Sequence, residues 1–217
     1  MRYALAIVVV AACGSDGGMS AFVDANASVS DGPSTSDAQP LPHGLLVSWK
    51  AMPRLPGTIE DGLTVTSVKF NISRLQVIGD NGQPMTSAPF TIAWETFGDP
   101  LTVGFSSAPA GLYSQVAIEM NPAQGVSYEI RGTAKVGQAT QPFYIHDTAS
   151  FDVDITGYNV TFTPGVDATL QVRIDLQPPL ETIDFGTATD IGGTLDVGPT
   201  DTQMAQFRDK LDDAFKR

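Results

Sequence analysis

The sequence is poor in cysteine and histidine. Its 217 residues include one cysteine, Cys13, and two histidines, His43 and His146. A single cysteine leaves no partner for a disulfide within the chain. The common zinc sites need clustered cysteine and histidine ligands, and His43 and His146 lie far apart in the sequence. The folded part of the chain is therefore expected to be held together by packing alone.

Basic residues are also scarce. Twelve Lys and Arg stand against 24 Asp and Glu, which gives a formal net charge of −12 at pH 7. No segment of the sequence forms the Lys/Arg cluster that phosphate-binding proteins carry. We therefore expect no nucleic-acid partner, and no docking on anionic lipid through charge alone. The acidity itself is typical of a soluble domain.

The familiar catalytic motifs are missing. The sequence has no Gly-x-Ser-x-Gly nucleophile elbow, no Gly-x-Gly-x-x-Gly loop and no Walker loop. His146 and Asp147 are adjacent, but neighbours on a strand face opposite sides and do not form a base and its orienting acid. The triplet Asp184-Phe185-Gly186 is not accompanied by the other kinase motifs. We therefore expect the protein not to be an enzyme.

The N-terminus has the form of a secretory signal. Arg2 precedes the apolar run Tyr3–Val10, which is too short to span a bilayer. Val10-Ala11-Ala12-Cys13 resembles a bacterial lipobox, and the resemblance implies cleavage after residues 1–12 and lipidation of Cys13. Two or more acyl chains anchor a protein stably in a membrane. The alternatives are an ordinary signal peptide that leaves a free thiol, or a buried N-terminal strand with Cys13 in the core.

Residues 13–42 are expected to be the acylated cysteine and a flexible linker. The segment is composed mainly of Ser, Asp, Gly, Ala, Asn and Pro, which cannot bury enough apolar surface to offset the entropy of ordering it. A flexible chain of this length reaches about 30 Å. Gly14 does not match the Asp that is typical of inner-membrane retention. We therefore expect an outer-membrane lipoprotein in the cell envelope, which presupposes a Gram-negative host.

Residues 43–198 show the period-two alternation of β-strands. The strongest segments are separated by Gly, Pro or Asn turns such as Asp80-Asn81-Gly82. Half-buried strands with one polar face are typical of antiparallel sheets. We therefore predict an all-β fold, an antiparallel β-sandwich of about nine strands. The apolar parity changes after Ile72 and resumes at Leu75, which predicts a bulge near Ser73-Arg74.

Residues 199–217 are predicted to be a short C-terminal amphipathic helix. Thr200 or Asp201 could cap it. The residues expected on its apolar side are Met204, Phe207, Leu211 and Phe215. This apolar stripe could pack on the sandwich, fray, or bind a partner.

Two stretches resemble a bacterial lipoprotein family of unknown function. They are Val65–Val77 followed by Asp80-Asn81-Gly82, and the turn Ala108–Val116 with its Pro-Ala-Gly-x-Tyr core; Phe151–Val153 and Thr169–Leu176 match the closing hairpin. The resemblance implies a transthyretin-like or immunoglobulin-like sandwich behind a lipobox. The family has no agreed activity, so the resemblance implies no functional residues.

Several side chains are candidates for binding. Asp147, Asp152 and Asp154 could supply hard oxygen ligands to Ca²⁺, the one cofactor considered, although alternating polar residues are also the ordinary pattern of a solvated strand. Tyr113 and Tyr144 fall opposite the expected core parity and are candidate surface binding residues. Trp49 and Trp94 share the parity of apolar neighbours, which favours core packing over a carbohydrate platform.

These observations favour a non-catalytic binding or structural domain held at a membrane through the lipid on Cys13. Its protein or glycan partner is not identified by the sequence. One alternative is a periplasmic assembly factor that engages a partner through an edge strand or the C-terminal helix. The other alternative is a carbohydrate-binding or carbohydrate-active surface protein.

Overall fold

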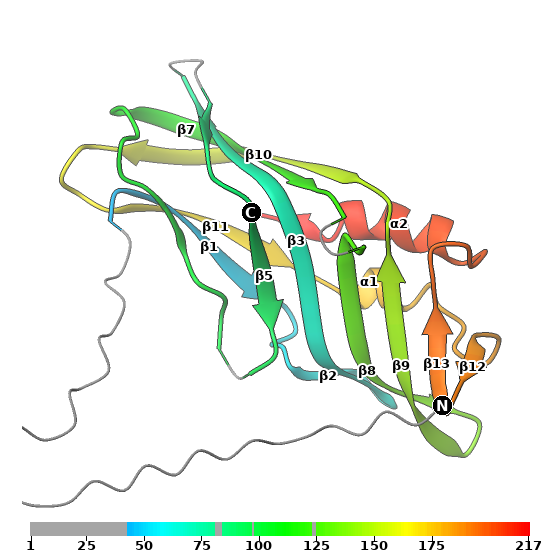
Figure 1. The fold of residues 1–217 in the computed structure, drawn as a ribbon. Helices are drawn as coiled ribbons and strands as arrows, with labels where there is room; N and C mark the ends of the chain where they lie inside the picture. The colour runs from blue at the N-terminus through cyan, green and yellow to red at the C-terminus, as the bar shows by residue number, and fades with distance from the viewer. Residues whose placement is uncertain (1–42, 81–83, 97, 123–124) are drawn as a thin grey trace, which may run out of the picture. The chain divides into compact units, whose positions relative to one another are not determined.

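The computed structural model describes residues 43–217, apart from 81–83, 97 and 123–124. The predicted signal peptide, Cys13 and the linker lie outside the described residues. The described part is an all-β sandwich of two sheets with two short helices, as the alternation predicts (Figure 1). None of its helices is long and apolar enough to cross a membrane.

The larger sheet is built around one long central strand, β3. Its strand order is β10-β7-β3-β8-β9-β13-β12. Three short strands, β2, β4 and β5, pair with the edge of β3 that faces away from β7 and β8. The bounds of these strands are β2 Gly57–Glu60, β3 Leu63–Gly79, β4 Met85–Thr86, β5 Phe90–Trp94, β7 Gly111–Met120, β8 Tyr128–Val136, β9 Ala139–Asp147, β10 Phe151–Phe162, β12 Thr189–Ile191 and β13 Thr194–Val197.

The strands β7 and β8 lie one after the other along the same side of β3. The C-terminal half of β3 pairs with β7, and its N-terminal half pairs with β8. The register of β3 against β7 shifts between Ile72 and Arg74, which confirms the predicted bulge at Ser73-Arg74. At this level Asn121 donates to the Ser73 hydroxyl at 3.0 Å, and Ser73 donates to the Glu119 carbonyl. These side chains satisfy polar groups where the ladder is interrupted.

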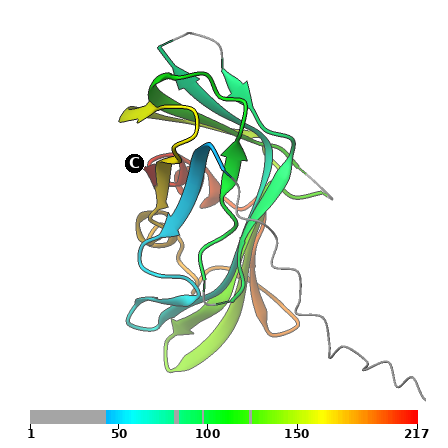
Figure 2. The same cartoon turned by 90° about the vertical axis from the view of Figure 1, so that its left-hand side faces the viewer.

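The smaller sheet has the order β14-β11-β1-β6 and packs against the larger one (Figure 2). Its strands are β1 Leu45–Ala51, β6 Val103–Phe105, β11 Ala168–Ile174 and β14 Phe215–Lys216. β1 and β11 are parallel, as are β9 and β13, whereas the other strand pairs of the described residues are antiparallel. These parallel pairs are not predictable from the sequence, because alternation within a strand does not report the direction of its neighbours.

The inward faces of both sheets form one core. β1 and β11 alternate buried and outward-facing residues, as their sequences predict. Trp49 and Trp94 are buried, which confirms the expectation of core packing. Trp49 contacts the ring of Phe90 at 6.2 Å between centroids, and Trp94 meets Phe70 edge to face. Such aromatic contacts add to the burial of apolar area in stabilising the sandwich.

The C-terminal segment is part of this core. A short helix α1 spans Gln177–Leu180, and α2 spans Met204–Asp212 with Gln203 at its N-cap. Met204, Phe207 and Leu211 of α2 are buried, so the apolar stripe packs on the sandwich. Phe215 is also buried, but it lies in β14, so the helix is shorter than predicted.

Candidate functional site

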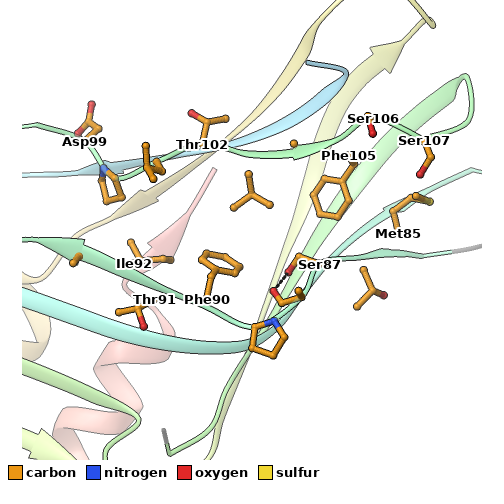
Figure 3. Close-up of a pocket in the computed structure, with 18 residues that line it drawn as sticks. Met85, Ser87, Phe90, Thr91, Ile92, Asp99, Thr102, Phe105, Ser106 and Ser107 are labelled. Atoms are coloured by element: carbon orange, nitrogen blue, oxygen red, sulfur yellow. Dashed lines mark hydrogen bonds between the residues drawn. The ribbon is translucent and has the colours of Figure 1, made fainter. Parts of the chain in front are cut away.

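A cleft of about 810 Å³ lies between two stretches of chain (Figure 3). One wall is Met85–Ala93, which contains β4 and β5. The other wall is Asp99–Ser107, which contains β6. β5 belongs to the larger sheet and β6 to the smaller one, so the cleft lies where the sandwich is open between its two sheets.

Apolar side chains line the interior of the cleft at every second position. Phe90 and Ile92 come from β5, and Val103 and Phe105 come from β6. Figure 3 shows Phe90, Ile92 and Phe105 pointing into the space between the walls, whereas Thr91 points away. Leu101, on the rim, is 80% exposed. This combination of an apolar floor and an exposed apolar rim is typical of a binding surface.

Both walls are sheet edges. In the described residues, β5 pairs with β3 alone and β6 pairs with β1 alone. Their outer backbone N–H and C=O groups therefore have no partner strand on the side of the cleft. An edge strand in this state is a template for pairing with a further strand, because backbone polar groups gain hydrogen bonds there.

The two tryptophans of the chain lie next to the cleft. Trp94 is the last residue of β5, and Trp49 packs against the cleft residue Phe90. The indole N–H groups of both are buried without a hydrogen-bond partner in the structure. The emission of Trp49 and Trp94 therefore reports on changes in this part of the sandwich.

The structure places Tyr113 in the core and not on the surface, so its prediction as a surface residue is wrong. Tyr113 is 2% exposed, and its hydroxyl donates to the Pro109 carbonyl at 2.9 Å. Burial raises the pKa of Tyr113, and the charge of Asp80 adds to this effect. The register of β3 against β7 shifts between Ile78 and Gly79, and this irregularity reverses the parity of β7 after Tyr113. Tyr113 therefore fixes the turn at Pro109.

Tyr144 is half-buried on the outer face of the larger sheet. The guanidinium carbon of Arg131 lies 3.9 Å from the centre of its ring, and the ring of His146 stacks on it at 4.6 Å. Its hydroxyl donates to Glu129 at 3.1 Å. Burial raises the pKa of Tyr144, and the hydrogen bond to Glu129 raises it further. The polar atom of Tyr144 is thus already engaged within the domain.

The three candidate calcium ligands do not come together. The side chain of Asp147 is fully buried and forms an ion pair with Arg208 at 2.6 Å, whereas Asp152 and Asp154 lie exposed on β10. The amide of Gln115 donates to Asp154 at 3.0 Å. Among the described residues, no group of three His, Cys, Asp or Glu side chains could hold a metal ion. The carboxylate of Asp147 serves a structural ion pair and is not a third ligand beside the other two.

The cleft is not predictable from the sequence, although the alternation over residues 43–198 includes both strands that line it. Alternation identifies a strand but does not show whether the strand lies at an edge. One signal was present: Pro89 precedes β5 and Pro100 lies before β6 in the second wall. Proline is confined to sheet edges and strand ends because it donates no backbone hydrogen bond.

Comparisons with protein-family models, curated protein sequences and solved structures find no match to this chain. The cleft and the surface of the described residues are therefore the starting point for its function.

Proposed function

We propose that the protein is an envelope lipoprotein, anchored through acylated Cys13, whose sandwich is a non-catalytic binding domain. The cleft between β5 and β6 is the binding site in this proposal, and it is the observation that carries it. The anchor rests on the lipobox-like Val10-Ala11-Ala12-Cys13 and the linker-like composition that follows. The domain would then be displayed within about 30 Å of the membrane surface.

The walls favour an extended polypeptide segment as the ligand. Successive side chains of a strand point to opposite faces, so every second residue of an added strand would meet the apolar residues of the cleft. The unpaired edges of β5 and β6 would supply hydrogen bonds to its backbone. Recognition by strand addition combines these two sources of affinity. A partner-binding or assembly role is therefore favoured over carbohydrate binding.

The chemistry of the lining favours binding over catalysis. Asp99 is the single titratable side chain among the described residues that line the cleft. The remaining lining side chains are aliphatic, aromatic or hydroxyl-bearing, apart from the thioether of Met85. General acid–base catalysis usually needs a second group with a matched pKa within hydrogen-bonding reach.

The proposal is tested by titrating the protein with synthetic octapeptides and recording tryptophan emission. One peptide alternates valine and serine, and a second has the same composition with its valines in one block. We expect the alternating peptide to change the emission at lower concentration, because only it places apolar side chains at every second position. Leu101→Asp introduces a charge at the rim and is expected to weaken binding about tenfold or more, since an uncompensated charge would be desolvated.

Ile191→Asp is the matched control. Ile191 is 61% exposed on β12, at the far edge of the larger sheet from β5. This substitution is expected to leave the titration unchanged. Equal responses to both peptides, or equal weakening by Leu101→Asp and Ile191→Asp, would contradict the assignment of the cleft.

A further inference from the structure

Three basic residues stand side by side on the outer face of the smaller sheet. Lys50 on β1 is the register partner of Arg173 on β11, and Arg173 is the partner of Lys216 on β14. All three side chains are exposed, whereas the residues before Lys50 and Arg173, Trp49 and Val172, are buried. We call Lys50, Arg173 and Lys216 the basic row.

A fourth base lies next to the basic row in the sequence. Arg217 follows Lys216 and donates to the carbonyl of Gly157 on β10. Burial raises the pKa of Tyr158 to about 12, while the nearby charges of Arg217 and Arg173 oppose the rise. Lys50, Arg173 and Lys216 are thus three of the twelve Lys and Arg residues of the chain, adjacent on one face.

This arrangement is unfavourable for the fold by itself. Neighbouring strands lie about 4.8 Å apart, and like charges directly opposite each other destabilise a sheet. The chain has twice as many acids as bases, yet it pairs Arg173 with two bases. Among the described residues, Asp175 lies 3.5 Å from the ammonium group of Lys216, and Arg173 donates to the side-chain oxygen of Gln171 at 3.4 Å. Asp213, which precedes β14, lies 4.0 Å from Lys210. The contacts of Asp175 and Gln171 offset the cross-strand repulsion only in part, and local rules that a sequence breaks are often broken for function.

We propose that the basic row docks the domain onto the anionic phospholipid headgroups of the membrane that carries its anchor. The inference rests on the proposed lipid anchor at Cys13. Charge complementarity supports it, because one base close to an anionic membrane gains about as much as a factor of five in binding. The linker would keep the domain within about 30 Å of that membrane, so weak contacts act at high effective concentration.

The remaining negative charge of the protein does not prevent this docking. At physiological ionic strength the Debye length is about 8 Å, so acids beyond that distance from the row are largely screened. Met52, two positions after Lys50, is 47% exposed and adds an apolar side chain beside the row. The expectation of no docking on anionic lipid rested on the acidity and on the lack of a Lys/Arg cluster in the sequence. The basic row brings bases together from distant parts of the chain.

Lysine acetylation of the anchored protein tests the inference. Purified acylated protein is reconstituted into vesicles of phosphatidylcholine alone, or of equal parts phosphatidylcholine and phosphatidylglycerol. The extent of acetylation of each lysine is then measured by mass spectrometry.

With phosphatidylglycerol we expect acetylation of Lys50 and Lys216 to fall about fivefold or more. High salt is expected to restore it. Lys135, exposed on β8 of the other sheet, is expected to react equally in both vesicles.

Charge reversal provides the second measurement. Arg173→Glu keeps both lysine reporters and is expected to abolish their protection, whereas Lys135→Glu is expected to preserve it. Equal acetylation of Lys50 and Lys216 in both vesicle types would overturn the docking. Low acetylation of Lys50 and Lys216 in neutral vesicles as well would show that something other than anionic lipid covers the basic row, such as the acidic linker or a second copy of the chain. That result would also overturn the docking.

Failure of the anchor gives a different result. A protein that does not float with neutral vesicles lacks the anchor of the proposed function. If added anionic vesicles then protect Lys50 and Lys216 from acetylation, and high salt removes this protection, the proposed docking through the basic row is still supported. If added anionic vesicles do not protect Lys50 and Lys216 from acetylation, the proposed docking through the basic row is contradicted as well.

Discussion

At the scale of single residues, the buried carboxylate of Asp147 accepts hydrogen bonds from several parts of the domain. Its carboxylate accepts hydrogen bonds from the guanidinium of Arg208, the hydroxyl of Tyr128 and the backbone N–H groups of Thr148 and Ala149. Burial alone would raise the pKa of Asp147, but these donors outweigh it and lower the pKa below its usual value. The ion pair with Arg208 ties the helix α2 to the end of strand β9.

Arg208→Met is therefore expected to destabilise the domain by about 3–5 kcal/mol, because it leaves the buried carboxylate of Asp147 unpaired. The free energy of unfolding is measured by denaturant titration at pH 7. The folded-state pKa of Asp147 lies below its unfolded value, so its contribution is present above the unfolded pKa and is lost as the pH falls through the folded pKa. The difference between wild type and Arg208→Met is therefore expected to shrink on acidification.

Lys210→Met is the control for Arg208→Met. Lys210 lies on the same helix, is half-exposed, and its ammonium group is 4.0 Å from Asp213. A surface pair of this kind contributes less than about 1 kcal/mol. Equal destabilisation by the two substitutions would show that the Asp147 ion pair does not hold α2 in place.

At the scale of elements, α2 is part of the folding unit. The ring of Phe207 stacks on Tyr128 of β8 with 6.0 Å between centroids, and Met204 and Leu211 are also buried. Removal of residues 200–217 would therefore expose core residues and remove β14. If a variant without residues 200–217 failed to bind a partner, the cause would be unfolding of the domain and not the loss of a partner-binding helix.

The close approach of β3, β8 and β9 gives a sharper prediction at this scale. A Cβ added at Gly132 of β8 would lie 2.0 Å from the carbonyl oxygen of Thr64 and 2.6 Å from the ring of Phe143. Gly132→Ala is therefore expected to destabilise the domain by about 1–3 kcal/mol or more. Gly98→Ala is the control, since a Cβ there meets no atom within 4 Å. Similar melting temperatures for the two variants would contradict this packing.

At the scale of the whole molecule, Cys13 and the linker are expected to decide where the domain is located. Cys13→Ser is expected to move the protein from the membrane fraction to the soluble fraction, because the acyl chains supply the anchoring energy. The measurement is immunoblotting of separated fractions, with Ser15→Ala as the matched control beside the anchor. An unchanged membrane fraction for Cys13→Ser would contradict lipidation of Cys13.

Protease treatment of intact cells locates the anchored domain. Cleavage within residues 14–42 while a periplasmic marker survives would place the sandwich on the cell surface. Protection until the envelope is broken would place it in the periplasm and favour the assembly role.

The sequence by itself determined the fold class and much of the core. Period-two alternation fixed which faces of β1 and β11 are buried, and the parity change fixed the bulge at Ser73-Arg74. These features are local, because side-chain direction alternates along a strand whatever its neighbours are. The prediction for Tyr113 failed because it assumed unbroken alternation. An irregularity in the pairing of β7 with β3 reverses the parity after Tyr113.

Only the tertiary structure decided which strands are neighbours, and with them both proposed surfaces. The cleft exists because β5 and β6 are edges of different sheets, and the basic row exists because β1, β11 and β14 are adjacent. The three strands of the basic row are far apart in the sequence, and β1, near the start of the described residues, pairs with β11, which begins at Ala168. Strand order arises from contacts between distant segments, and the alternation within each strand carries no record of them.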